Sequence, residues 1–406
     1  MTATRSGLLT YENGLLLLLG VTFGVVFIDR NALTTLMPFI QHEFGLSNTQ
    51  VGLLAACLSI TWGLSGYVIG TLSDKAGRRK PFLIVAVLLF SLTAMISGFA
   101  QGFLSLLLAR LAMGLAEGPV FPLSQSLLAT TSSENRRGLN AGLMQATITS
   151  LIGLIAAPVL LVSVAGTHGW RAAFFVASLP GLVMALLMMR FIREPRIAAA
   201  AKAAGHGGMP QLSLLKVRNV ALCMGIAICE VSWMVIAWAF LPLYFVEIRH
   251  FAPGTMGYLI GSLGISSAIF GLALPALSDR IGRKPVVLFF SAIALVIPLG
   301  VAFGPADPLL VGILLLIGWS ASGIFPVFMA TIPAESVPAA SLGAAIGLVG
   351  GIGEVLGGFF GPQVAGVLAD RFGLGAPLVL MGVLALISVA LAAGLIETHP
   401  RRRITS

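Results

Sequence analysis

The segment GTLSDKAGRRKP, residues 70–81, returns in altered form as PALSDRIGRKP, residues 275–285. Asp74 of the first copy corresponds to Asp279 of the second, 205 positions further along the chain. The same offset relates Gly77 to Gly282, Arg78 to Arg283, Gly138 to Gly343 and Gly142 to Gly347. A fixed offset between matching segments indicates an internal repeat. The chain is therefore predicted to consist of two similar halves.

The composition places both halves in a membrane. Of the 406 residues, 57% are hydrophobic and 10% are charged, whereas soluble domains carry about 25% charged residues. A helix that spans a bilayer needs roughly 20 apolar residues. Twelve apolar runs of suitable length are present, at 13–37, 50–72, 81–101, 103–129, 138–164, 171–192, 217–246, 256–277, 285–303, 308–332, 341–368 and 375–396. We predict an all-α membrane protein whose twelve transmembrane helices form two pseudo-symmetric six-helix bundles.

The longest polar stretch separates the two halves. It reads EPRIAAAAKAAGHGGMPQLSLLK and lies between the sixth and seventh apolar runs. We therefore expect an N-terminal bundle at 1–193, a cytoplasmic linker at 194–216 and a C-terminal bundle at 217–406. Two halves related by an axis along the membrane normal are the plan of transporters that bind their substrate near the bilayer midplane.

The net charge of +9 and the pI of about 10.1 are explained by topology. With the N-terminus inside, most basic residues fall in cytoplasmic segments: Arg5, Lys75, Arg78, Arg79, Lys80, Arg136, Arg137, Arg193, Arg196, Lys202, Lys216, Arg218, Arg280, Arg283, Lys284, Arg401, Arg402 and Arg403. The opposite loops hold only Arg171, Arg249 and Arg371. Cytoplasmic loops of membrane proteins carry such an excess. We expect a multi-pass protein of the cell membrane, taken as a bacterial inner membrane, with both termini cytoplasmic and no nucleic-acid partner.

The repeated segment resembles the signature of the major facilitator superfamily, G-x-L-x-D-R/K-x-G-R-R/K. The second copy departs from it, because Pro275 stands where the first glycine belongs. The resemblance implies a gating motif made of Gly70, Asp74, Gly77, Arg78, Asp279, Gly282 and Arg283. It also implies that the two acids close the cytoplasmic side in one state, Asp74 against the eleventh span and Asp279 against the fifth.

Charged residues lie inside the predicted spans, where each costs at least about 2.5 to 3.5 kcal/mol. At 1.5 Å per residue, Asp29 lies roughly 21 Å above the cytoplasmic boundary and Arg110 roughly 10 Å below the outer one, so they share a depth. Seven residues separate Arg110 from Glu117, which places both on one face of the fourth span. These residues are expected to be paired or functional.

The sequence around Glu117 predicts a closely packed and interrupted helix. Gly114 and Gly118 form a small-xxx-small pattern that lets another backbone approach. Pro119 and Pro122 prevent a straight, fully bonded helix.

Our hypothesis assigns different roles to the neighbouring Asp29 and Arg30, because they project about 100° apart. Asp29 would pair with Arg110, leaving Arg30 to present its donor fork to a carboxylate substrate. Burial among apolar residues favours the neutral acid, so Glu117 would take up a proton near neutral pH. Proton coupling would then involve Glu117, Asp29 and Arg110. The alternative is a permanent ion-pair network that only fixes helix packing.

The pattern of Asp29 and Arg30 with R-x-x-x-G-x-x-E-G at 110–118 also resembles two branches of that superfamily. One is the anion:cation symporter branch, which moves sugar acids and other organic carboxylates, and the other is the Spinster-like branch of lipid transporters. The segment GWRAAFF at 169–175 is similar to the anion branch. In both branches, residues matching Arg30 and Glu117 are implicated in substrate binding and proton coupling.

Further polar residues are candidates for the same cavity. Glu230 and Glu354 each lie about 20 Å above the cytoplasmic ends of their spans, and either could be a second proton site or simply hydrogen-bonded. Gln145 lies about 10 Å from the cytoplasmic side and is a candidate substrate contact. Small residues around Glu354, at 353, 357 and 361, suit tight helix packing.

These features predict a secondary active transporter that carries an organic anion together with a proton. The runner-up is a proton-driven exporter of lysolipids or amphiphilic drugs. No catalytic set, metal site or cofactor motif is visible, so we expect neither an enzyme nor a cofactor, with the proton gradient as energy source. We expect a monomer that has the lipid bilayer and a small organic anion or lipid-like substrate as its partners.

Overall fold

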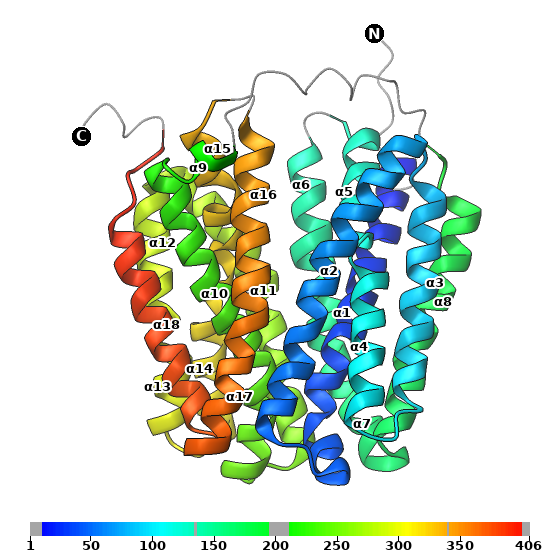
Figure 1. Ribbon diagram of the computed structural model, residues 1–406, viewed down its shortest axis with the longest axis vertical. Helices are drawn as coiled ribbons and strands as arrows, with labels where there is room; N and C mark the ends of the chain where they lie inside the picture. Colours follow the sequence, from blue (N-terminus) through cyan, green and yellow to red (C-terminus); the bar gives the residue numbers. More distant parts are fainter. Residues whose placement is uncertain (1–9, 134–135, 195–210, 339–340, 400–406) are drawn as a thin grey trace.

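The computed structural model describes residues 10–133, 136–194, 211–338 and 341–399. Twelve helices in these ranges are long and apolar enough to cross a membrane, and they coincide with the twelve predicted runs. The all-α fold is therefore confirmed. Figure 1 shows the helices standing side by side, with α1 beginning and α18 ending at the end drawn uppermost, which we name the terminal end; the other is the far end.

The first six spans are formed by α1 (Tyr11–Phe44), α2 (Asn48–Ala76), α3 (Lys80–Ser97), α4 (Phe103–Glu117) with α5 (Val120–Thr131), α6 (Arg137–Gly142) with η2 (Leu143–Ile148), η3 (Ser150–Ala156) and α7 (Ala157–His168), and α8 (Trp170–Phe191). The short α9 (Gln211–Leu214) follows. The last six spans are α10 (Arg218–Leu243) with η5 (Tyr244–Ile248), α11 (Pro253–Ile281), α12 (Arg283–Ile293) with α13 (Val296–Phe303), α14 (Pro308–Trp319) with η6 (Ser320–Ile324), η7 (Val327–Thr331) and α15 (Ile332–Ser336), α16 (Leu342–Ile352) with η9 (Gly353–Phe360) and α17 (Gly361–Phe372), and α18 (Ala376–Ala393).

The fourth and tenth spans are interrupted at corresponding positions. The fourth breaks between Glu117 and Val120, where Pro119 lacks the amide hydrogen that helix continuation requires. The tenth changes to a 3-10 turn at Ser320–Ile324. The predicted interruption of the fourth span is confirmed, and the two halves repeat it.

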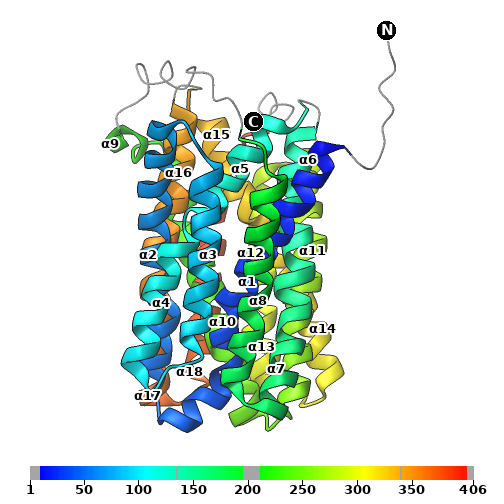
Figure 2. The ribbon, with the colours of Figure 1, turned by 90° about the vertical axis from the view of Figure 1, so that its right-hand side faces the viewer.

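The two halves pack against each other most closely toward the far end. There α2 lies against α17 (Figures 1 and 2). It also lies against η9, and α11 lies against η3 and α7. The contact at α2 is backbone to backbone, because a Cβ added to Gly52 would lie 2.2 Å from the carbonyl oxygen of Pro362. Glycine is therefore required at this crossing.

A carboxylate joins the halves at the far end. Asp370, in the last turns of α17, accepts hydrogen bonds from the backbone N–H groups of Asn48 (2.8 Å) and Thr49 (2.8 Å) and from the Thr49 hydroxyl (2.5 Å). These amides belong to the first turn of α2 and have no partner within their own helix. Asp370 thus acts as the cap of a helix in the other half.

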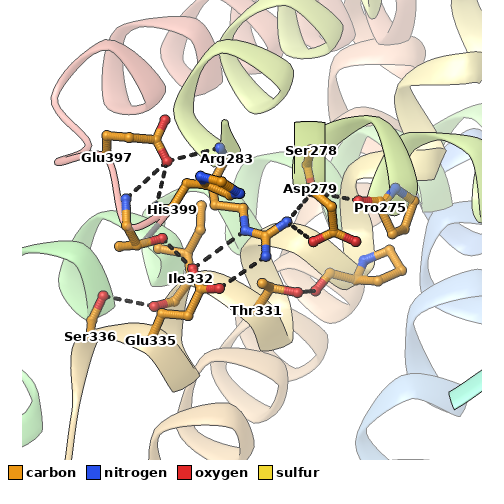
Figure 3. Close-up of polar contacts among 12 residues, drawn as sticks. Pro275, Ser278, Asp279, Arg283, Thr331, Ile332, Glu335, Ser336, Glu397 and His399 are labelled. Carbon is orange, nitrogen blue, oxygen red and sulfur yellow. Dashed lines mark hydrogen bonds and ion pairs between the residues drawn. The ribbon is translucent and has the colours of Figure 1, made fainter. Parts of the chain in front are cut away.

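The second copy of the repeated segment is bonded within its own half (Figure 3). Arg283 pairs with Asp279 and with Glu335 at 3.0 Å, and it donates to the Ser278 hydroxyl at 2.8 Å. The side chain of Asp279 is 65% exposed. In this state Asp279 is held by Arg283, so the contact with the fifth span that the family resemblance implied stays a prediction for another state.

Each copy is also capped by an acid that follows the sixth helix of its half. Glu194 accepts from the N–H groups of Arg79 (2.6 Å) and Lys80 (3.1 Å), and Glu397 accepts from those of Arg283 (2.9 Å) and Lys284 (3.1 Å). The roles of Glu194 and Glu397 were not predicted from the repeated segments, because each acid lies more than a hundred residues from the segment that it caps.

The first copy is described only in part. Gly77 adopts φ +65°, a left-handed conformation that glycine adopts readily, and the Ser73 hydroxyl donates to the Arg78 carbonyl at 2.7 Å. Gly282 likewise has a positive φ of 106°. The side chain of Asp74 lies outside the described part of the structure, so its predicted contact with the eleventh span stays a prediction.

Candidate functional site

Arg110 is buried on α4 and reaches the backbone of α1. Its Nη2 donates to the carbonyl oxygen of Arg30 at 2.8 Å, and its Nη1 approaches the Met113 sulfur at 3.3 Å. Arg110 therefore lies at the depth of Asp29 and Arg30, as predicted. The predicted ion pair is wrong, because the carboxylate oxygens of Asp29 have no hydrogen-bond partner and form no ion pair with Arg110 within 4.0 Å. Depth along a helix does not give its rotation, and the guanidinium meets a peptide carbonyl instead.

Glu117 is fully buried at the end of α4, with neither carboxylate oxygen hydrogen-bonded. The small-xxx-small prediction beside it is confirmed. A Cβ on Gly118 would lie 2.2 Å from the Trp62 carbonyl oxygen of α2, and one on Gly114 would lie 2.7 Å from that of Leu58. The close contact of α2 with α4 closes this side of Glu117 and leaves its carboxyl without a partner from α2.

Four charged residues, Asp29, Arg30, Arg110 and Glu117, interact electrostatically around these helices, and we name them the charged layer. Asp29 interacts electrostatically with Glu117 and Arg110, and Glu117 interacts with Arg30 and Arg110. This set holds two acids and two arginines, and Glu354 of η9 is a third acid beside Arg30. A change of charge on one of them is therefore felt by the others, since electrostatic interactions are strong in a medium of low dielectric constant.

Arg30 extends from α1 toward the other half of the protein. Its guanidinium lies 3.9 Å from Glu354 of η9, 5.5 Å from the ring centre of Trp62 and 6.0 Å from that of Phe27. The contact of Arg30 with Glu354 was not predicted. The depths calculated from the sequence could have indicated it, because Asp29, next to Arg30, lies at about 21 Å and Glu354 at about 20 Å.

Glu230 and Glu354 do not share a site. Glu230 is 1% exposed and accepts a hydrogen bond from the Ser388 hydroxyl at 2.6 Å, and Ser388 lies 3.1 Å from Ser291. This group lies between α10, α12 and α18, inside the C-terminal half. Glu230 is therefore hydrogen-bonded through one carboxylate oxygen, while the other has no partner, and its role as a second proton site stays a prediction.

The small residues around Glu354 behave as predicted. A Cβ on Gly353 would lie 2.9 Å from that of Ala227, and one on Gly357 would lie 2.6 Å from the Ile228 carbonyl oxygen. The Ser232 hydroxyl of α10 also donates to the Gly357 carbonyl at 3.1 Å. Close packing of η9 on α10 thus fixes the height of Glu354 opposite Arg30.

A small cavity lies between the halves beside Arg30. It is lined by Arg30, Asn31, Thr34, Ala55, Leu58, Ser59, Arg110, Val235 and Trp238. A second small cavity adjoins it, lined by Asn31, Thr34, Thr35, Leu154, Pro158, Trp238, Ile260 and Leu263. Gln145 is exposed and lines neither cavity, so the structure does not bring it together with Arg30.

Comparison with known proteins agrees with this architecture. The family model described as Major Facilitator Superfamily matches residues 19–305 and 222–406. The chain is 28% identical over 92% of its length to a probable 4-methylmuconolactone transporter of Cupriavidus pinatubonensis, covering 87% of that protein. It is 23% identical to a D-galactonate transporter of Escherichia coli, over 92% of each chain.

A solved structure also shares the fold. A bacterial homologue of the human lysosomal transporter Spinster, in an inward-facing and occupied conformation, superimposes with a TM-score of 0.76 at 18% identity, over 95% of this chain and 96% of that one. The predicted resemblance to the superfamily is confirmed. At this identity, the likeness to the Spinster homologue shows the fold alone.

Proposed function

This chain belongs to the Major Facilitator Superfamily and is a membrane transporter, not an enzyme, and we propose that it carries an organic carboxylate across the membrane together with a proton. The observation that carries this proposal is the cavity between the halves, lined by Arg30 and Arg110, together with the buried Glu117. Its carboxyl has no hydrogen-bond partner and interacts electrostatically with both arginines. Arginine is suited to a carboxylate because its planar donors match the two carboxylate oxygens.

The names of similar proteins support an organic anion as the substrate. Besides the two relatives above, a cis,cis-muconate transport protein of Acinetobacter baylyi is 28% identical over 87% of this chain. These compounds all bear or readily form a carboxylate. The two arginines offer the positive charge that such a substrate needs.

In the proposed cycle, Arg30 binds the substrate carboxylate and Glu117 carries the proton. Glu354 is the counter-ion of Arg30 while the cavity is empty, and the substrate takes its place. A proton on Glu117 offsets the negative charge that enters with the substrate, because both groups interact with Arg30. Asp29 and Arg110 hold the charged layer in position around them.

Transport would proceed by alternating access of the two bundles, 1–193 and 217–406, joined by the linker at 194–216. In the state described, the halves meet at the far end through α2 and α17. The excess of basic residues at the terminal end supports a cytoplasmic location for that end. The membrane we propose is a bacterial inner membrane, with both termini in the cytoplasm.

The test is transport by purified protein in liposomes with an imposed pH gradient. We expect accumulation of a carboxylate only when the substrate side is acidic. Glu117→Gln should abolish this accumulation and retain exchange of labelled for unlabelled substrate, because exchange does not require release of the proton. The control is Glu247→Gln, which changes an exposed acid outside the cavity. Gradient-driven accumulation by Glu117→Gln would contradict the coupling role.

Arg30 is tested in the same assay. Arg30→Ala should weaken carboxylate binding roughly tenfold to a hundredfold, since a hydrogen bond to a charged group contributes about 1.5–3 kcal/mol. Arg30→Lys keeps the charge but loses the planar fork, so binding should recover only in part. Full activity of Arg30→Ala would remove the proposed substrate contact.

A further inference from the structure

The two cavities are adjacent but differ in chemistry. They share Asn31, Thr34 and Trp238. The first cavity contains both cations, Arg30 and Arg110. None of the residues that line the second cavity is charged. A ligand that fills both would therefore meet charge at one end only.

The second cavity is mainly apolar. Leu154 and Pro158 of the fifth span face Ile260 and Leu263 of α11 across it. All four are at least nine-tenths buried. Burial of apolar ligand surface against such side chains is favourable, and a hydroxyl group of a ligand placed against these four side chains would lose its hydrogen bonds to water without replacement.

The polar residues shared by the cavities are already engaged within α1. The Asn31 amide donates to the Phe27 carbonyl at 3.0 Å, and the Thr34 hydroxyl donates to the Asn31 carbonyl at 3.0 Å. The two shared residues therefore offer few free donors to a substrate with several hydroxyl groups, and the second cavity adds only the Thr35 hydroxyl. A polyhydroxylated acid would leave most of its hydroxyls unpaired in this part of the site.

Trp238 forms a rigid wall along both cavities. Its ring lies 6.3 Å from that of Phe27 at 79°, and 5.9 Å from that of Trp319 at 42°. The Trp319 indole is fixed in turn, because its N–H donates to the Ser267 hydroxyl at 2.8 Å. A wall held on two sides suits the flat face of a ring, since aromatic pairs prefer offset-stacked or edge-to-face geometry.

We propose that the two cavities form one site for a monocarboxylate with an apolar body, either a ring or a short hydrocarbon chain. The carboxylate meets Arg30 in the first cavity, and the apolar body lies along Trp238 and enters the second. A dicarboxylate is disfavoured because the second cavity offers no cation. This inference rests on the proposed function and narrows its substrate class.

The test is a binding series on the purified protein, with acetate, propionate, butyrate, pentanoate and 3-phenylpropionate, and with gluconate and succinate for comparison. Each methylene that enters the second cavity should tighten binding about fourfold. We expect 3-phenylpropionate to bind at least tenfold more tightly than gluconate or succinate. Tighter binding of gluconate or succinate would overturn this inference and leave the proposed function standing.

Two variants of α11 test whether the apolar body of the ligand lies in the second cavity. Ile260→Thr should weaken 3-phenylpropionate binding by a factor of roughly three to ten and leave acetate binding unchanged, because acetate reaches only the first cavity. The matched control is Ile265→Thr on the same helix, at a side chain that is 42% exposed and lines neither cavity. Equal effects of the two variants would contradict the placement. If the folded protein binds none of these acids, the proposed function itself fails.

Discussion

The Arg30 guanidinium and the Glu354 carboxylate lie 3.9 Å apart across the boundary between the two halves of the protein. Both side chains are mostly buried, with 12% and 22% of their surface exposed. The Glu354 oxygen nearest to Arg30 has no hydrogen bond. The pair is therefore loose, and an incoming carboxylate can replace Glu354 without breaking a hydrogen-bond network.

Replacing Glu354 by glutamine should tighten carboxylate binding by up to about fivefold. The variant removes the charge that competes for Arg30. Because the pair is 3.9 Å long and its nearest oxygen has no hydrogen bond, we assign it the contribution of an exposed ion pair, about 0.2–1 kcal/mol. The measurement is the dissociation constant by titration calorimetry, with Glu247→Gln as a control that should leave it unchanged. Weaker binding in Glu354→Gln would indicate that the acid itself contacts the substrate.

Replacing Asp370 by alanine should open the far end. The variant removes the cap that joins α17 to the first turn of α2, and a lost cap costs about 0.5–2 kcal/mol. The proportion of molecules with a separated far end should rise by a factor of roughly two to thirty. Spin labels at the exposed positions Gln101 and Tyr258, one in each half and both near the far end, would report the separation as a distance distribution.

The control for this experiment is Asp307→Ala. Asp307 caps α14 within its own half, where it accepts from the Leu310 N–H at 3.0 Å. Its loss should lower the thermal stability by a comparable amount and leave the label distances unchanged. A shift of equal size in both variants would show that the opening reflects general destabilisation.

Replacing Gly118 by alanine should destabilise the N-terminal half by about 1–3 kcal/mol. The new methyl group would lie 2.2 Å from the Trp62 carbonyl oxygen, and a backbone atom cannot move aside as a side chain can. The midpoint of thermal unfolding in detergent measures the loss. Gly63→Ala on α2 is the control, since its methyl group would meet nothing within 4 Å and alanine favours the helix.

The bonds of Glu397 predict that the stability of the fold falls at low pH. Burial by itself would raise the pKa of this carboxyl, but backbone N–H bonds from His399, Arg283, Lys284 and Thr398 outweigh it and hold the pKa below its ordinary value. The carboxylate therefore stabilises the fold above its ordinary pKa, and this contribution is lost as the pH falls through the lowered pKa.

The measurement is the thermal midpoint of the wild type and Glu397→Gln between pH 3 and 7. We expect the wild type to be the more stable at neutral pH, and the difference to shrink in acid because protonation removes the same charge. Glu247→Gln should follow the wild type throughout. A constant difference across this range would show that the hydrogen bonds of Glu397 do not depend on its charge.

Much of the fold could be predicted because its signals are local in the chain. Apolar runs of about 20 residues indicate the spans whatever their neighbours are. The break after Glu117 follows from Pro119, which cannot continue a helix. The close contact at Gly118 follows from small residues spaced one turn apart. The depth of a charge also follows, since the rise per residue is constant.

Contacts between charges could not be predicted, because they depend on how each helix is rotated and which helix faces it. Arg110 shares a depth with Asp29, yet it bonds to the Arg30 carbonyl. Glu230 points into its own bundle toward Ser388, while Glu354 faces Arg30 across the boundary. The sequence by itself determined the helices, their repeat and the heights of their charges. Only the packing of the two halves decided which charges meet and where the apolar part of the cavity lies, since that packing sets the rotation of every helix.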